Sequence, residues 1–175
     1  MAQHLPGFWR RNGPVLRTWA IFALSIGGMV SLLAFPPLTH FFDVDLAAFI
    51  ARLVGPIFGL LGTPVAVSGN NLSSGRFAAQ IIAACTPVLP SILYLAAILA
   101  FPSRLKAKLW GAVLGLPVLF AINLVRIVNL FYIGSYFPQY LEVAHYLVWQ
   151  GLIILAAVAL WLVWLEVVTP RYEHA

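Results

Sequence analysis

Long apolar runs alternate with short polar connections along most of this chain. A helix needs about 20 mostly apolar residues to cross the hydrocarbon of a bilayer. Runs of this kind predict about four transmembrane helices, over residues 19–38, 86–103, 110–132 and 142–167. The pattern therefore predicts an all-α membrane protein, with residues 1–175 forming a single polytopic membrane domain.

A stretch of different character, residues 40–84, lies between the first and second predicted spans. Residues 43–61 mix apolar side chains with charged ones and a Gly-Pro pair, which is typical of an amphipathic helix in or near the membrane interface. Residues 65–72 and 77–82 are short runs typical of strands, and Gly, Asn and Ser provide turns. We expect a small β-hairpin on the outer membrane surface.

The composition indicates that lipid is the main solvent of this chain. Hydrophobic residues make up 62% and charged residues only 9%, whereas soluble domains carry roughly 25% charged residues. The net charge of +5 comes from basic residues beside apolar runs, so it indicates membrane topology and not nucleic-acid binding. Any chemistry must be built from the helices and their short connections.

The basic residues also predict the orientation, because cytoplasmic loops carry an excess of Lys and Arg. The first run ends at Phe35-Pro36-Pro37 without a small-residue cleavage site, so we expect a retained anchor. We expect the inner (cytoplasmic) membrane, both termini in the cytoplasm and the hairpin on the periplasmic face. The cytoplasmic basic residues are Arg10, Arg11, Arg17, Arg104, Lys106, Lys108 and Arg171.

This topology brings three unusual residues to a similar depth. Cys85, the single cysteine, lies at the outer start of the second span, and His145 lies about one turn inside the outer end of the fourth. Arg126 lies roughly 24 Å above Trp110, at a rise of about 1.5 Å per residue. Three helices therefore deliver a thiol, a guanidinium and an imidazole to one level.

Each of these residues also has a purely structural explanation. Cys85 could be a small apolar residue, and His145 an interfacial polar residue. An intramembrane arginine costs at least about 2.5–3.5 kcal/mol on insertion scales and is usually functional. Arg126 could nevertheless extend to the outer headgroups or pair with Asn123 and Asn129.

Together the three side chains suit acyl transfer. A thiolate attacks a peptide carbonyl, an imidazole moves the proton, and a guanidinium stabilises the oxyanion. Thr86 and the following proline predict a helix start beside Cys85, which favours the thiolate. Glu142 could orient His145, or it could be a solvated acid at the start of a helix.

No cofactor or metal is expected from the sequence. His40, Asp43 and Asp45 fit no standard set of metal ligands. A Gly-rich phosphate loop, an HExxH motif and a GxSxG motif are all absent.

The order of these residues resembles the exosortase/archaeosortase family. An Ala-Cys-Thr sequence at Cys85 follows the predicted hairpin, an N-x-x-R sequence runs from Asn123 to Arg126, and His145 comes early in the next span. The resemblance covers roughly residues 60–165, and the short length is similar to compact members of the exosortase H type.

The resemblance implies a membrane cysteine protease or transpeptidase. Its substrates would be secreted proteins with a C-terminal sorting signal, which comprises a short motif, a transmembrane helix and a basic tail. The enzyme would cleave through a Cys85 thioester at the outer face and transfer the product to an envelope acceptor. Arg126 would stabilise the oxyanion or the thiolate, and His145 would carry the proton.

The chain departs from the family pattern next to the cysteine. Many members have an acidic residue shortly before the cysteine and a Ser-Gly or Thr-Gly pair after it, whereas this chain has Ala84 and then Thr86-Pro87. Proline has no backbone N–H to offer an oxyanion.

Two alternatives remain open at this stage. A non-enzymatic transporter or assembly factor would use Arg126 as an anion or partner site. An intramembrane peptidase would use water as the acceptor.

Overall fold

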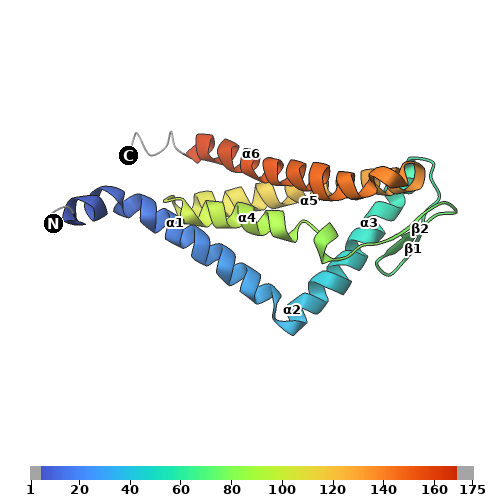
Figure 1. The fold of residues 1–175 in the computed structure, drawn as a ribbon, viewed down its shortest axis with the longest axis horizontal. Helices are drawn as coiled ribbons and strands as arrows, with labels where there is room; N and C mark the ends of the chain where they lie inside the picture. The colour runs from blue at the N-terminus through green and yellow to red at the C-terminus, as the bar shows by residue number, and fades with distance from the viewer. Residues whose placement is uncertain (1–4, 169–175) are drawn as a thin grey trace.

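The computed structural model describes residues 5–168 and is mostly helical, with a small sheet at one end (Figure 1). Short π-helical segments precede α3 and α6, at Phe41–Leu46 and Val143–Trp149. The helices are α1 (Leu5–Leu33), α2 (Pro36–His40), α3 (Ala47–Leu60), α4 (Val88–Ala100), α5 (Leu105–Tyr136) and α6 (Gln150–Val168).

Three helical stretches in the described part of the chain are long and apolar enough to cross a membrane: Asn12–Leu33, Leu105–Tyr136 and Val143–Val168. The second predicted span corresponds to α4, which has only 13 residues and a length of about 20 Å. Its helical conformation ends because Phe101, which precedes a proline, is extended. The number of four spans therefore stays a prediction.

The first predicted span ends earlier than expected. α1 stops at Leu33, and Phe35 is extended with φ −73° and ψ 122° because a proline follows it. The chain turns there, so that α1 and α3 diverge from α2 in a V (Figure 1).

The predicted helix over residues 43–61 is confirmed, and its apolar face is buried. Ala47, Ile50, Val54 and Phe58 follow one helical stripe and are fully buried. This stripe packs on α5, where the ring centroids of Phe58 and Phe131 are 4.8 Å apart. α3 therefore connects the sheet to α5.

The sheet has three antiparallel strands, so the prediction of a two-stranded hairpin was wrong in strand number. The strands are β1 (Ala66–Ser68), β2 (Asn71–Ser73) and β3 (Ala78–Gln80), in the order β1-β2-β3. Gly69 has a φ of +60° and opens a two-residue loop inside the first predicted strand. Such a loop takes glycine first in a type II′ turn.

A second apolar core joins α4, α5 and α6. Tyr94 of α4 donates a hydrogen bond of 2.9 Å to the carbonyl oxygen of Gly111. A Cβ atom at Gly115 would lie 2.2 Å from the Tyr94 hydroxyl oxygen, so the missing side chain permits this close packing. Glycines commonly serve this purpose between membrane helices.

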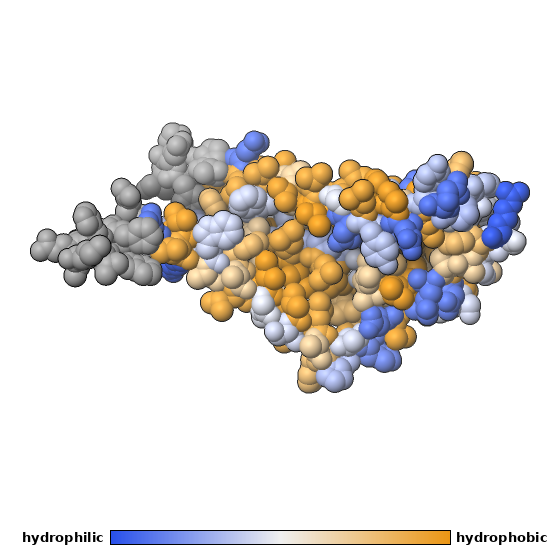
Figure 2. All heavy atoms as spheres, in the orientation of Figure 1, coloured by the Kyte–Doolittle hydropathy of each residue, from blue (hydrophilic) through white to orange (hydrophobic). Residues whose placement is uncertain are grey.

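Large apolar side chains also cover the outside of the helices, as the orange surface in Figure 2 shows. Leu24 is 75% exposed and Leu155 is 65% exposed. Lipid would cover such a surface, whereas water would not solvate it well. These findings support a membrane protein.

The start of α1 and the end of α6 lie at the same end of the molecule, opposite the sheet (Figure 1). This arrangement agrees with the predicted order of crossings. Arg171, which contributes to the predicted orientation, lies outside the described residues.

Candidate active site

A tight 3-10 turn, Ala83–Cys85, holds Cys85 between β3 and α4. The Cys85 backbone N–H donates a 2.8 Å hydrogen bond to the Ile82 carbonyl oxygen. The hydroxyl of Thr86 donates to the Ala83 carbonyl oxygen over 2.6 Å. The turn is thus fixed on both sides of the thiol.

The helix start beside the thiol differs from the prediction. α4 begins at Val88 with Pro87 as its N-cap, and no side chain caps the helix. Thr86 does not cap α4, because its hydroxyl is bonded to the preceding 3-10 turn.

Asn123 connects α5 directly to this turn. Its side-chain Nδ2 donates a 2.9 Å hydrogen bond to the Cys85 carbonyl oxygen. Asn123 is fully buried, and Arg126 follows it on the same face of α5, since residues three apart on a helix are neighbours. The Asn-x-x-Arg spacing therefore places one contact to Cys85 and one cation side by side.

Arg126 is buried without an anionic partner. Its side chain is 2% exposed and its Nε atom donates no hydrogen bond. Within residues 5–168 no Asp or Glu side chain forms an ion pair with it. The titratable groups that interact electrostatically with Arg126 are those of Cys85 and His145.

The two structural explanations offered for Arg126 do not fit this environment. A side chain that extends to the headgroups would be exposed, whereas Arg126 is enclosed. Asn123 bonds to Cys85 instead, and Asn129 is exposed and accepts a 2.8 Å hydrogen bond from Trp149 Nε1. Asn129 therefore lies away from the predicted site.

His145 meets the thiol from the π-helical segment before α6. Its Nε2 atom lies 3.8 Å from Cys85 Sγ, and its ring is half-buried. The ring packs edge-to-face against Tyr146, with centroids 4.6 Å apart. π-Helical turns inside α-helices are frequent at functional sites.

Glu142 is the N-cap residue of this segment, and its side chain is exposed. In the described part of the chain it forms no ion pair with His145. The structure thus brings Cys85, Arg126 and His145 together, whereas Glu142 lies at the edge.

The three residues line one cleft with a volume of about 280 Å³. The cleft lies between β3, α5 and the start of the last helical segment. Its walls are mostly apolar and include Phe77, Ile81, Ile127, Leu130, Phe131 and Tyr146. A few convergent polar groups in an apolar cleft are typical of a ligand or active site.

Phe77 is a cleft residue that the sequence analysis did not identify. Its ring lies where a Cβ atom at Gly134 would be, 2.4 Å from the Phe77 Cζ atom. An aromatic residue at the start of a strand is too common a signal to indicate such a role.

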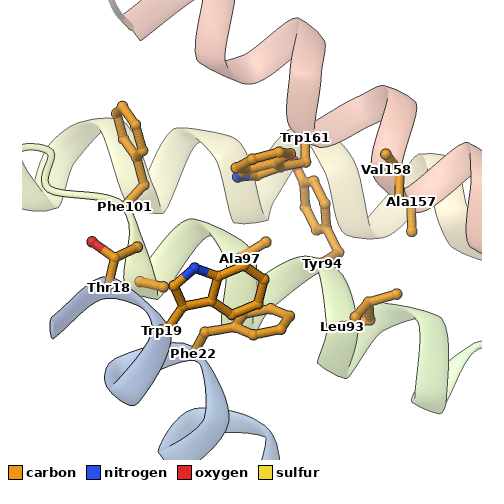
Figure 3. Close-up of a pocket in the computed structure, with 11 residues that line it drawn as sticks. Thr18, Trp19, Phe22, Leu93, Tyr94, Ala97, Phe101, Ala157, Val158 and Trp161 are labelled. Carbon is orange, nitrogen blue, oxygen red and sulfur yellow. The ribbon is translucent and has the colours of Figure 1, made fainter. Parts of the chain in front are cut away.

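A second large pocket lies between α1, α4 and α6 and has a volume of about 270 Å³. Figure 3 shows aromatic rings of Trp19, Phe22, Tyr94 and Trp161 around it. Its lining contains no thiol, carboxyl or imidazole group. It therefore lacks the groups for acyl transfer that the cleft has.

His40 and Asp45, two of the three residues that fit no standard set of metal ligands, have their Nδ1 and Oδ2 atoms 3.6 Å apart and are both exposed. Among the described residues there is no group of three or more His, Cys, Asp or Glu side chains arranged to hold a metal ion.

Comparison with known proteins gives one informative match. A model of the transmembrane exosortase family matches residues 13–165, which include Cys85, Arg126 and His145. No curated protein and no solved structure matches the chain. The match covers most of the chain and agrees with the resemblance seen in its motifs. This protein therefore belongs to the transmembrane exosortase family.

Proposed function

We propose that this protein is a membrane cysteine transpeptidase that processes exported proteins bearing a C-terminal sorting signal. The observation that carries the proposal is the 3.8 Å approach of Cys85 Sγ and His145 Nε2 in a cleft that also contains the buried Arg126. Membership of the exosortase family supports a membrane transpeptidase as the class of enzyme.

In the first half of the reaction His145 Nε2 accepts the thiol proton, and the Cys85 thiolate attacks the scissile carbonyl carbon of the substrate. A C–S bond forms and the carbonyl oxygen becomes an oxyanion. When this intermediate collapses, the C–N bond breaks and the His145 imidazolium gives its proton to the leaving amine. The new carboxyl end of the substrate is left as a thioester on Cys85.

In the second half an acceptor nucleophile attacks the thioester carbonyl carbon. His145 takes the acceptor's proton, the C–S bond breaks, and the proton returns to the cysteine sulfur. An amine acceptor gives a transferred product, whereas water gives a free carboxylate. Apolar walls that exclude water from the cleft would favour transfer.

Two residues of α5 prepare this chemistry. The Arg126 guanidinium offers several N–H groups in a fixed fork, which suits an oxyanion or a thiolate in a dry site. Asn123 holds the Cys85 carbonyl oxygen and so fixes the nucleophile relative to Arg126. Since proline at position 87 has no N–H, Arg126 is the donor we assign to the oxyanion.

Replacement of the nucleophile tests the proposal. In cells that produce an exported reporter with a motif, a transmembrane helix and a basic tail, Cys85→Ala and Cys85→Ser should lower the processing rate by more than about 10³-fold, because the thioester cannot form. The control is Ala84→Ser, which changes the exposed neighbour. Immunoblots of reporter and enzyme would measure processing and membrane levels.

Normal processing by Cys85→Ala at wild-type membrane levels would refute the enzymatic proposal. Mass spectrometry of the processed reporter separates transfer from hydrolysis, because hydrolysis leaves an unmodified C-terminal carboxylate. A transporter or assembly factor that uses Arg126 would behave differently: Arg126→Ala would abolish its function and Cys85→Ala would be almost silent.

A further inference from the structure

A polar cavity lies beside the catalytic cleft, on the other side of the loop between β2 and β3. Its volume is about 280 Å³, and its walls come from the segment that follows α3, from this loop and from the end of α5. Arg76 lines this cavity and Phe77 lines the catalytic cleft, so adjacent residues face the two sites. The lining includes Gly62, Thr63, Arg76, Tyr132 and Tyr136.

Arg76 supplies a cation to this cavity. Its guanidinium carbon lies 5.3 Å from the centre of the Tyr136 ring, a cation–π arrangement. In the described part of the chain no carboxylate forms an ion pair with it. The cation–π contact positions the guanidinium and leaves its N–H groups free to donate to an anion.

Hydroxyl groups complete the lining. Thr63 Oγ1 and Tyr132 OH are 2.7 Å apart, so one of them donates to the other. The proton of the accepting hydroxyl is then available to a ligand, since each hydroxyl carries one donor. Arg76 and this pair together form a site suited to the oxygens of a phosphate group.

The position of the cavity indicates where that phosphate comes from. Tyr132 and Tyr136 lie roughly 9 and 15 Å beyond Arg126 along α5, at about 1.5 Å per residue, which is the headgroup level if Arg126 lies in the outer hydrocarbon. Leu60 is 89% exposed and Leu61 is 55% exposed, and both immediately precede Gly62 of the cavity. A cation site beside exposed leucines matches a phospholipid better than a free anion.

We propose that this cavity binds the headgroup phosphate of a phospholipid of the outer leaflet. Arg76 and the Thr63–Tyr132 pair donate hydrogen bonds to the phosphate oxygens, and Leu60 and Leu61 contact the acyl chains. Because the loop of Arg76 continues into Phe77 of the cleft, the bound lipid fixes this wall of the catalytic cleft at the membrane surface.

Native mass spectrometry of the purified full-length protein in detergent would test the site. The probes are phosphatidylglycerol, diacylglycerol with the same acyl chains, and inorganic phosphate. The wild type should bind phosphatidylglycerol at least tenfold more tightly than the other two probes. Arg76→Gln should weaken that binding about tenfold, whereas Arg52→Gln, at an exposed arginine of α3, should leave it unchanged.

A second variant tests whether the hydroxyl pair contributes to lipid binding, without a change in net charge. Tyr132→Phe removes one hydroxyl and should weaken phosphatidylglycerol binding about threefold, the effect of one ordinary hydrogen bond. Equal binding by Arg76→Gln and Arg52→Gln would overturn the proposal, as would equal binding of diacylglycerol. Inorganic phosphate that competes at the same concentration as the lipid would show a free-anion site and overturn the lipid assignment.

Discussion

Arg126 sits in an environment that opposes its charge. A buried cation without a partner costs several kcal/mol relative to water, and Arg126 is 2% exposed with no acidic partner in residues 5–168. The enzymatic proposal accounts for this arrangement, because the Cys85 thiolate or the substrate oxyanion supplies the missing negative charge. A guanidinium held ready in this way needs little reorganisation during the reaction.

The contribution of the planar guanidinium of Arg126 to processing can be tested separately from that of its positive charge. Arg126→Lys keeps a cation but loses the planar fork, so we expect the reporter processing rate to fall about 10²-fold, the effect of losing an oxyanion donor. Time-resolved immunoblots would measure the rate, and Arg52→Lys on α3 is the matched control. Processing of the reporter by Arg126→Lys at the wild-type rate would show that only the charge is needed.

At the residue scale the sequence predicted which residues form the candidate site but not the contacts between them. Helix rise placed Cys85, Arg126 and His145 at one depth because rise along a helix is regular. The rotation of one helix against another does not follow from spacing. The bond from Asn123 to the Cys85 carbonyl and the displacement of Thr86 from the cap both depend on the 3-10 turn.

At the scale of elements, α5 is the helix that contacts most of the residues around the candidate site. α3, α4 and α6 all pack on it, and it carries both Asn123 and Arg126. Two glycines of α5 permit this close packing. A Cβ atom at Gly111 would lie 2.6 Å from Nε1 of Trp164 in α6, and a Cβ atom at Gly115 would lie 2.2 Å from the hydroxyl oxygen of Tyr94 in α4. Because Cys85 lies just before α4, the packing of α4 on α5 helps to position Cys85 relative to Asn123 and Arg126.

Gly115→Ala should therefore destabilise the protein, although alanine favours a helix more than glycine does. The added methyl group meets the Tyr94 ring, and overpacking of this kind typically costs about 1–3 kcal/mol. Gly27→Ala in α1 is the matched control, because nothing lies within 4 Å of its Cβ position. Thermal unfolding in detergent should show a lower Tm for Gly115→Ala and an unchanged or higher Tm for Gly27→Ala. Equal shifts in the two variants would contradict this account of the α4–α5 contact.

The sequence predicted long apolar helices well and short elements less well. Apolar length alone identifies most of α5 and α6, whereas their ends depend on local geometry. Residues 65–72 resemble one strand in the sequence because the turn between β1 and β2 depends on a positive φ at one residue, Gly69. The surrounding residues keep the pattern of a strand. α4 is shorter than its apolar run because prolines next to it restrict the backbone.

At the scale of the whole molecule, the structure has two chemically distinct ends. The sheet, the cleft that contains Cys85 and the cavity of Arg76 lie at one end, while α1 starts and α6 ends at the other (Figure 1). Figure 2 shows an apolar surface between them and hydrophilic residues at the sheet end. Under the proposed function, a substrate helix in the same bilayer presents its motif to Cys85 without leaving the membrane.

α5 connects these two ends and gives the most direct test of orientation. Its 32 residues span about 48 Å at 1.5 Å per residue, which exceeds the roughly 30 Å of bilayer hydrocarbon. α5 is therefore long enough to emerge from the hydrocarbon on both sides. Arg104, Lys106 and Lys108 lie at its start, and the positive-inside rule predicts that this end is cytoplasmic.

In a Cys85→Ala background, a single cysteine at Ser68 in β1 should react with a membrane-impermeant maleimide added to spheroplasts. A cysteine at Leu105, 70% exposed at the start of α5, should react only after the membrane is permeabilised. Gel-shift of the labelled protein measures both reactions, and each variant labelled after permeabilisation serves as its own control. The reverse labelling pattern would place the Cys85 cleft on the cytoplasmic side of the membrane. An exported substrate could not reach the cleft there after translocation. This result would refute both the predicted orientation and the proposed sorting function.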